Sequence, residues 1–303
     1  MGPIWGIDLG GTKIEGVVIE DTKSMNVLKR MRLPTGAENG YVHVLRQIYK
    51  LVETLTAEIG MRPEKIGIGT PGILDPSTQK LKNANTVCLN GKPLKNDLEN
   101  LLGISLEMAN DANCFALAET KLGVVRDMAP EAKTVWGIIM GTGVGSGVVI
   151  NGNILNGKHG IAGEWGHMFI DESGGECYCG KTGCVEKIIS GPALTAYYNN
   201  LLGTDISLPE IVERFYDGMD NKATETMERL IYFFGKAAAN VINILDPDVV
   251  VLGGGLGNID LLYSDGFESV KQHIFNDKLE ALFLKPKLGD SAGVFGAALL
   301  CED

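Results

Sequence analysis

The sequence predicts an α/β fold built from two similar halves. Short apolar strands alternate with helical stretches along the whole chain, which is the pattern of an α/β protein. A glycine-rich strand pair near the N-terminus also returns in mid-chain, where residues 5–21 align with 136–152 without a gap and share eight identities. Chance resemblance between two glycine-rich hairpins is the alternative, but a shared tryptophan and the ungapped register favour a repeated unit.

The first half opens with a predicted β-hairpin. A short strand over 4–8 leads into a glycine-rich bend, and the β-branched run 14–19 follows it. No helix begins directly after the bend, which excludes the Rossmann and Walker-A phosphate loops. Further along, the patterns predict a helix over 41–59, a buried strand over 66–70, a strand over 106–109 and a helix that begins at Asp111.

The second half repeats this order with a long insertion. Its hairpin over 136–150 is followed by an irregular glycine- and cysteine-rich stretch and then by a helical region over 192–245. A buried strand over 249–252 leads into a third glycine turn. We therefore expect a small domain over 1–112, completed by 289–303, and a large domain over 113–288 that carries the cysteine-rich loop.

Composition narrows the classes of partner. Of the 303 residues, 45% are hydrophobic and 21% are charged, as in ordinary globular proteins, and the formal net charge is −11. This acidic balance disfavours broad attraction to nucleic-acid phosphates. No apolar run is long enough to span a bilayer, and the N-terminus lacks the pattern of a signal peptide. We expect a cytoplasmic protein that binds neither nucleic acid nor membrane.

Three glycine turns are candidates for nucleotide binding. Successive backbone N–H groups can hold phosphate oxygens where the chain comes close, and glycine allows such turns. An ordinary tight turn is the alternative for any one of them, but two matching hairpins and a third turn after a buried strand favour a nucleotide site. The predicted ATP-binding residues are Gly10, Gly11, Thr12, Lys13, Gly141, Thr142, Gly143, Val144, Gly145, Gly253, Gly254 and Gly255.

Asp8 lies at the end of the first predicted strand, beside the first glycine turn. One interpretation is that its carboxylate accepts backbone N–H groups of the turn. The other places it near a Mg²⁺ ion, directly or through water, because Mg²⁺ in phosphoryl-transfer sites keeps several waters and few carboxylates.

A cluster of soft and borderline donors predicts a zinc site. Cys177, Cys179 and Cys184 follow His167 within 18 residues, with glycines between them that let the loop fold back. A disulfide is disfavoured, because three cysteines leave one unpaired and a reducing compartment opposes it. Four protein ligands leave no open position, so the predicted role of the zinc is structural.

Carboxylates near this loop are candidate sugar ligands. The second ring nitrogen of His167 has its direction set once the first binds the metal, and it can meet a substrate hydroxyl. Glu164 and Glu186 bracket the loop and suit vicinal hydroxyls, although either alone is more often a solvated residue. Asp111 follows a strand and opens a helix, so it is either an N-cap or the carboxylate that accepts the proton of an attacking hydroxyl.

Together these motifs resemble the ROK family of bacterial sugar kinases and sugar-responsive repressors. The resemblance covers almost the whole chain, and its most specific parts are Gly163-Glu-Trp-Gly-His167 and Cys177-x-Cys-Gly-x-x-Gly-Cys-x-Glu186. It implies a two-domain actin-like, ribonuclease H-like fold, with ATP and sugar in an interdomain cleft, and commonly homodimers. It also implies that Asp111 is the catalytic base and that the sugar contacts are Gly72, Asn85, Asn110, Asp111, Glu164, His167 and Glu186.

Within that family, the segments around Asn85 and before Gly253 look most like fructokinase or mannokinase enzymes. We therefore expect phosphorylation of a hexose 6-hydroxyl of the fructose or mannose type, with N-acetylglucosamine kinase or glucokinase as alternatives. A sugar-sensing regulator is disfavoured, because the first strand begins at Ile4 and leaves no room for a helix-turn-helix ahead of it. A non-catalytic sugar-binding protein is disfavoured because both Asp8 and Asp111 are present.

Overall fold

The computed structural model describes residues 2–302, which form two compact units. The first holds the residues up to Met128, Gly147–Ala162 and those from Lys287 onward, and the second holds Ala129–Ser146 and Gly163–Pro286. The sequence places the boundary at residue 112 instead. In the structure the first unit continues beyond it, because helix α3 (Asp111–Lys121) packs against α10 (Ala292–Leu299) near the C-terminus.

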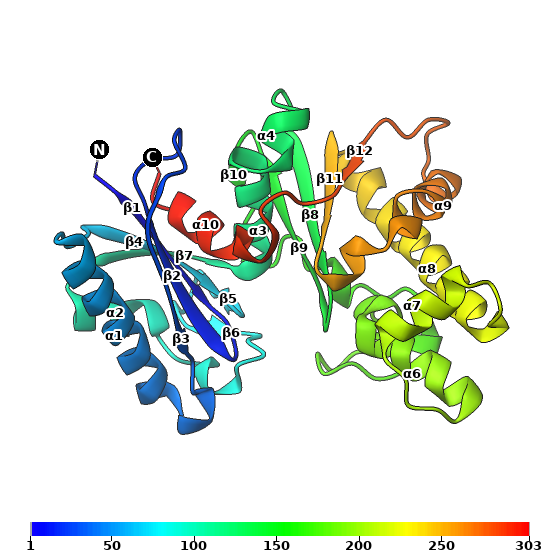
Figure 1. The fold of residues 1–303 in the computed structure, drawn as a ribbon, viewed down its shortest axis with the longest axis horizontal. Coiled ribbons are helices and arrows are strands. Elements are labelled where there is room, and N and C mark those ends of the chain that lie inside the picture. The colour runs from blue at the N-terminus through cyan, green and yellow to red at the C-terminus, as the bar shows by residue number, and fades with distance from the viewer. Residues whose placement is uncertain (1, 303) are drawn as a thin grey trace. The chain divides into compact units, whose positions relative to one another are not determined.

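The first unit is a five-stranded sheet covered by helices on both faces (Figure 1). Its strands run in the order β3-β2-β1-β4-β7, with α1 and α2 packed on one face and α3 and α10 on the other. The apolar stripe of α1 supplies much of the core. The elements are β1 (Ile4–Leu9), β2 (Lys13–Ile19), β3 (Val27–Pro34), α1 (Tyr41–Ile59), β4 (Lys65–Thr70), α2 (Leu94–Leu102), β7 (Ser105–Asn110), and the small pair β5 (Ile73–Leu74) and β6 (Leu81–Lys82).

Strand register gathers the polar ends of this sheet. β1, β4 and β7 are parallel, and Asp8 pairs with Gly69 while Thr70 pairs with Asn110. The carboxyl ends of the three strands therefore lie at one edge, which is where sites collect in open α/β sheets. On the other side of β1, the antiparallel hairpin places Asp8 opposite Glu15 of β2.

The second sheet repeats the plan of the first. Its order is β10-β9-β8-β11-β12, so β8 takes the place of β1, β9 that of β2 and β11 that of β4. As in the first sheet, the strands equivalent to β1, β4 and β7 are parallel. This agreement confirms the predicted repeat. The strands are β8 (Thr134–Met140), β9 (Val144–Ile150), β10 (Asn153–Ile154), β11 (Val249–Gly253) and β12 (Leu282–Leu284).

Helices of the second unit surround the long α8 (Asn221–Leu245), which buries an apolar face along its length. The others are α5 (Glu186–Ile189), α6 (Gly191–Leu202), α7 (Leu208–Tyr216) and α9 (Asp265–His273), and α4 (Val124–Met128) ends the first run of the first unit. Between residues 2 and 302, none of the helices combines the length and apolar character that crossing a bilayer needs.

Candidate functional site

The first unit brings two carboxyl groups together at its sheet edge. Asp8 is the last residue but one of β1. Burial raises its pKa to about 6, with further contributions from the charges of Asp111 and Glu15 against the opposing charge of Lys13. Gly293 of α10 lies so close that a Cβ there would stand 3.1 Å from Asp8 Oδ2. Asp8 and Asp111 are thus two carboxyl groups close enough to repel each other, which disfavours ionisation of both.

Asp111 is the first residue of α3 and is not its N-cap. The Oδ1 atom of Asn110 accepts the N–H of Asn113 at 2.8 Å and takes the capping role. The Asp111 carboxylate accepts the adjacent N–H of Ala112, also at 2.8 Å, and the residue keeps an exposed surface. Desolvation raises its pKa, against the two local backbone hydrogen bonds. A carboxylate with this freedom is suited to act as a general base.

The remaining first-unit candidates lie at the glycine turn and on a nearby hairpin. The turn closes by a hydrogen bond from Gly10 N to Lys13 O at 2.9 Å, and leaves Gly11 and Thr12 exposed. Gly72 is buried against Ala84, the residue before Asn85, so these two predicted sugar contacts lie near each other, with Asn85 exposed.

The second unit brings its two glycine turns together. Gly254 has a positive φ of 78°, and a Cβ there would lie 2.2 Å from the carbonyl oxygen of Met140, at the start of the second hairpin turn. Gly191 at the beginning of α6 donates its N–H to Gly141 O at 2.9 Å. Two backbone turns and a helix N-terminus thus meet at one place, an arrangement that favours anionic phosphate.

Tryptophan packing positions Glu164 and His167. Trp165 lies edge-on to Trp136 with ring centroids 5.1 Å apart, and Ser146 Oγ donates to Gly163 O at 2.6 Å. Gly166 passes so close to β9 that a Cβ would stand 1.9 Å from Val144 O. These contacts hold the segment of Glu164 and His167 against the second hairpin.

Glu186 ties the same hairpin to the cysteine loop. One of its carboxylate oxygens, Oε2, accepts the N–H of Val144 at 2.9 Å, and a Cβ on Gly143 would lie 2.7 Å from that oxygen. Glycine at 143 therefore leaves the space that the carboxylate occupies. Glu186 is thus partly buried and hydrogen-bonded, and is not a solvated surface residue.

The four predicted metal ligands converge. The donor atoms of His167, Cys177, Cys179 and Cys184 all lie within 4.8 Å of one another. Cys177 Sγ lies 3.6 Å from His167 Nδ1, and Cys179 Sγ lies 3.6 Å from Cys184 Sγ. A tetrahedral zinc with bonds of about 2.1–2.3 Å separates its ligands by about 3.4–3.8 Å, which the two separations of 3.6 Å match.

Comparison with known proteins identifies the family of this chain. The ROK family model matches residues 4–303. The chain belongs to the ROK family. An N-acetyl-D-glucosamine kinase of Vibrio cholerae is 35% identical over 306 residues and covers 98% of each chain, and one of Pasteurella multocida is 34% identical over 307 residues with the same coverage.

Solved structures agree with this assignment. A ROK hexokinase of Thermus thermophilus has a TM-score of 0.86 and 32% identity over 98% of this chain and 97% of its own. A ROK family glucokinase of Streptomyces griseus, in complex with glucose and AMPPNP, has a TM-score of 0.79 and 27% identity over 99% of each chain. The expected two-domain actin-like fold and the sugar-kinase family are confirmed.

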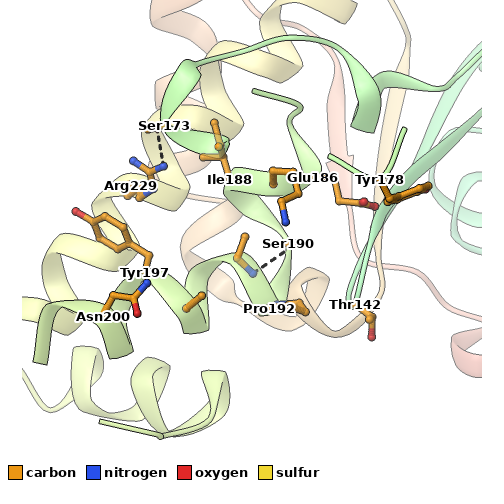
Figure 2. Close-up of a pocket in the computed structure, with 14 residues that line it drawn as sticks. Thr142, Ser173, Tyr178, Glu186, Ile188, Ser190, Pro192, Tyr197, Asn200 and Arg229 are labelled. Atoms are coloured by element: carbon orange, nitrogen blue, oxygen red, sulfur yellow. Dashed lines mark hydrogen bonds between the residues drawn. The ribbon is translucent and has the colours of Figure 1, made fainter. Parts of the chain in front are cut away.

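One residue of the site in this ROK protein escaped the sequence reasoning. Tyr178 stands between Cys177 and Cys179, two of the predicted metal ligands, and its hydroxyl lies 3.0 Å from His167 Nε2. With Thr142 and Glu186 it lines a cavity of about 610 Å³ that continues to Tyr197 and Arg229 (Figure 2). Its place between two predicted metal ligands was the available signal, because a metal bound there would limit where the ring can lie.

Proposed function

We propose that this ROK protein transfers the γ-phosphoryl group of ATP to the 6-hydroxyl of a hexose, and that N-acetylglucosamine is its preferred acceptor. The observation that carries the transfer is Asp111, whose carboxylate is released from capping by Asn110 and has a raised pKa. The curated relatives from Vibrio and Pasteurella are N-acetyl-D-glucosamine kinases. They favour that sugar over the fructose or mannose expected from the sequence.

In the proposed reaction, Asp111 accepts the proton of the sugar hydroxyl as its oxygen attacks the γ-phosphorus. The bond between phosphorus and the bridging oxygen of ADP breaks, and the products are sugar 6-phosphate, ADP and the protonated carboxyl group. The glycine turns offer backbone N–H groups to the phosphates, with Thr12 and Thr142 as hydroxyl donors. Support for ATP comes from the Streptomyces glucokinase, which binds AMPPNP.

Asp8 is the proposed carboxylate toward Mg²⁺, which neutralises phosphate charge when bound. Its pKa of about 6 belongs to the protein without the ion. A cation beside Asp8 and Asp111 opposes the repulsion between them and lowers both pKa values. Asp8 and Asp111 repel each other in the protein without the ion, and a bound cation would offset this repulsion. The cation thus gives a reason for the two carboxyl groups to lie close together.

For the sugar, we propose Asn110, Glu164, His167 and Glu186 as ligands, with Gly72 and Asn85 shaping the site. The side-chain amide nitrogen of Asn110 stays available, because its Oδ1 is the atom that caps α3. Zinc bound by His167 and the three cysteines supplies a fixed loop and no reactive water, since all four positions belong to the protein.

A coupled assay of ADP release tests the proposal over N-acetylglucosamine, glucose, N-acetylmannosamine, mannose and fructose. We expect the highest kcat/KM on N-acetylglucosamine. A higher value on fructose or mannose contradicts the preferred acceptor and leaves the kinase in place. If no sugar causes ADP release, the proposed kinase activity is contradicted. A non-catalytic sugar-binding protein is then the better explanation. Homodimer formation and a cytoplasmic location stay predictions.

A further inference from the structure

The two ring nitrogens of His167 face different partners. Nδ1 lies 3.6 Å from Cys177 Sγ, within the donor cluster, while Nε2 lies 3.0 Å from the hydroxyl of Tyr178. When Nδ1 binds the metal, the neutral imidazole carries its proton on Nε2. Nε2 is then a donor and the Tyr178 oxygen is its acceptor. The hydroxyl of the proposed sugar would accept the same proton from Nε2.

Tyr178 reaches this position with little other support. Its side chain is 74% exposed, and its ring stands edge-on to His167 with centroids 5.2 Å apart and an angle of 89° between the planes. Because the ring is largely exposed, a change of χ1 carries it into solvent at small cost.

We propose that Tyr178 is an internal competitor of the sugar, holding His167 Nε2 in the empty site and yielding that nitrogen to a sugar hydroxyl. A single donor proton cannot serve two acceptors at full strength, so binding of the sugar through His167 requires that the contact with Tyr178 breaks. The phenol satisfies Nε2 in the empty site and thereby sets part of the affinity for the sugar. This inference rests on the proposed function only in that a sugar binds at His167.

Removal of the Tyr178 hydroxyl is expected to lower the Kd for the sugar, whereas removal of a hydroxyl that binds the sugar would raise it. In a Tyr178→Phe protein the sugar no longer displaces a hydrogen bond, so its Kd falls by about two- to tenfold, the range of one neutral hydrogen bond. A residue that binds the sugar by its hydroxyl would show a rise instead. Titration calorimetry with N-acetylglucosamine in the absence of ATP measures the Kd, and an unchanged or raised value overturns the proposal.

Tyr197→Phe is the matched control. Tyr197 lines the far end of the same cavity and its hydroxyl donates to Glu225 at 2.7 Å, away from His167. We expect the Kd for the sugar to stay unchanged in this variant. Zinc content is measured in all three proteins and is expected to be equal, since Tyr178 supplies no donor atom to the cluster.

A spectroscopic readout separates displacement from a purely structural effect. With ¹⁵N-labelled histidine in the zinc-loaded protein, the Nε2 signal of His167 is expected to differ between the wild type and Tyr178→Phe without sugar, and to coincide when both are saturated with sugar. A difference that persists in the bound state overturns the proposal, because Tyr178 would still contact the ring. Retained binding without ADP release contradicts the proposed kinase alone and leaves this comparison in force.

Discussion

The two halves of this ROK protein share a strand plan and carry different chemistry. At the positions of Asp8 and Glu15 in the first hairpin, the second hairpin has Ile139 and Ser146. Asp111 follows β7, whereas Lys285 follows the equivalent strand β12. The first half has Asp8 and Asp111 at the carboxyl ends of its parallel strands, and the second half has glycine turns and the cluster of His167 with three cysteines. In the proposed function, the first copy would supply the proton acceptor and the cation site, and the second the loops that hold the substrate.

Removal of the Asp111 carboxylate tests the first half most strongly. In Asp111→Asn, kcat is expected to fall by about 10²–10⁴-fold, because the amide cannot accept the proton. Sugar affinity measured by calorimetry is expected to stay close to that of the wild type. Glu107→Gln on β7, the strand that precedes Asp111, is the control, since Glu107 forms a surface ion pair with Lys65. Retention of substantial kcat in Asp111→Asn would contradict its assignment as the base.

Loss of a zinc ligand tests the second half. In Cys179→Ser we expect metal content, measured by elemental analysis, to fall from about one ion per chain and the sugar KM to rise by about 10–100-fold. The physical reason is that His167 is itself a predicted ligand and Glu186 lies two residues after Cys184, another predicted ligand. Cys88→Ser, outside the cluster, is expected to change neither quantity. Full metal content together with full activity in Cys179→Ser would remove the structural role of zinc.

A single methyl group is expected to have different effects at two positions of the second hairpin turn. Position 143 corresponds to Thr12 in the first hairpin, yet here a Cβ would stand 2.7 Å from Glu186 Oε2. Gly143→Ala is expected to displace this carboxylate and to raise the sugar KM by about tenfold. Gly141→Ala in the same turn meets no atom closer than 4.0 Å and is expected to leave that KM unchanged. Equal KM values in the two variants would show that Glu186 does not need the space.

The smallest expected effect is on stability and depends on pH. Asp8 ionises near 3.8 in the unfolded chain and at about 6 in the folded protein, so the free energy of unfolding falls as pH rises through this window. Asp8→Asn removes the cost and is expected to stabilise the metal-free protein by about 1–2 kcal/mol at pH ~8, after allowance for partial solvation, while it impairs turnover. Urea unfolding at several pH values measures this.

Asp21→Asn is the control of opposite sign. The pKa of Asp21 is lowered, first by the backbone N–H of Ser24, so its carboxylate favours the folded state above its ordinary pKa. Its replacement is expected to give no gain in stability at high pH. A gain in both variants would point to a general effect of net charge, and not to the pair of carboxyl groups at the first sheet edge.

The sequence by itself determined the repeat, the family and which four side chains form the donor cluster. These follow from local patterns: the identities in the two hairpins lie at one register, and the cysteines lie close enough along the chain to meet in a loop. Tertiary packing decided the roles of individual side chains, which residue spacing does not specify. Whether Asn110 or Asp111 caps α3 depends on side-chain direction, and Glu186 became a hydrogen-bonded residue only because Val144 and Gly143 approach it.

The domain division and Tyr178 show the same limit. Helix α3 belongs with the first unit because it packs on α10, a contact between segments far apart in the chain that no local pattern contains. Tyr178 contacts His167 across a folded loop, where ring geometry and not residue order brings hydroxyl and imidazole together. Residue types and their spacing thus defined which chemistry was available, and tertiary packing decided which atoms were left free to perform it.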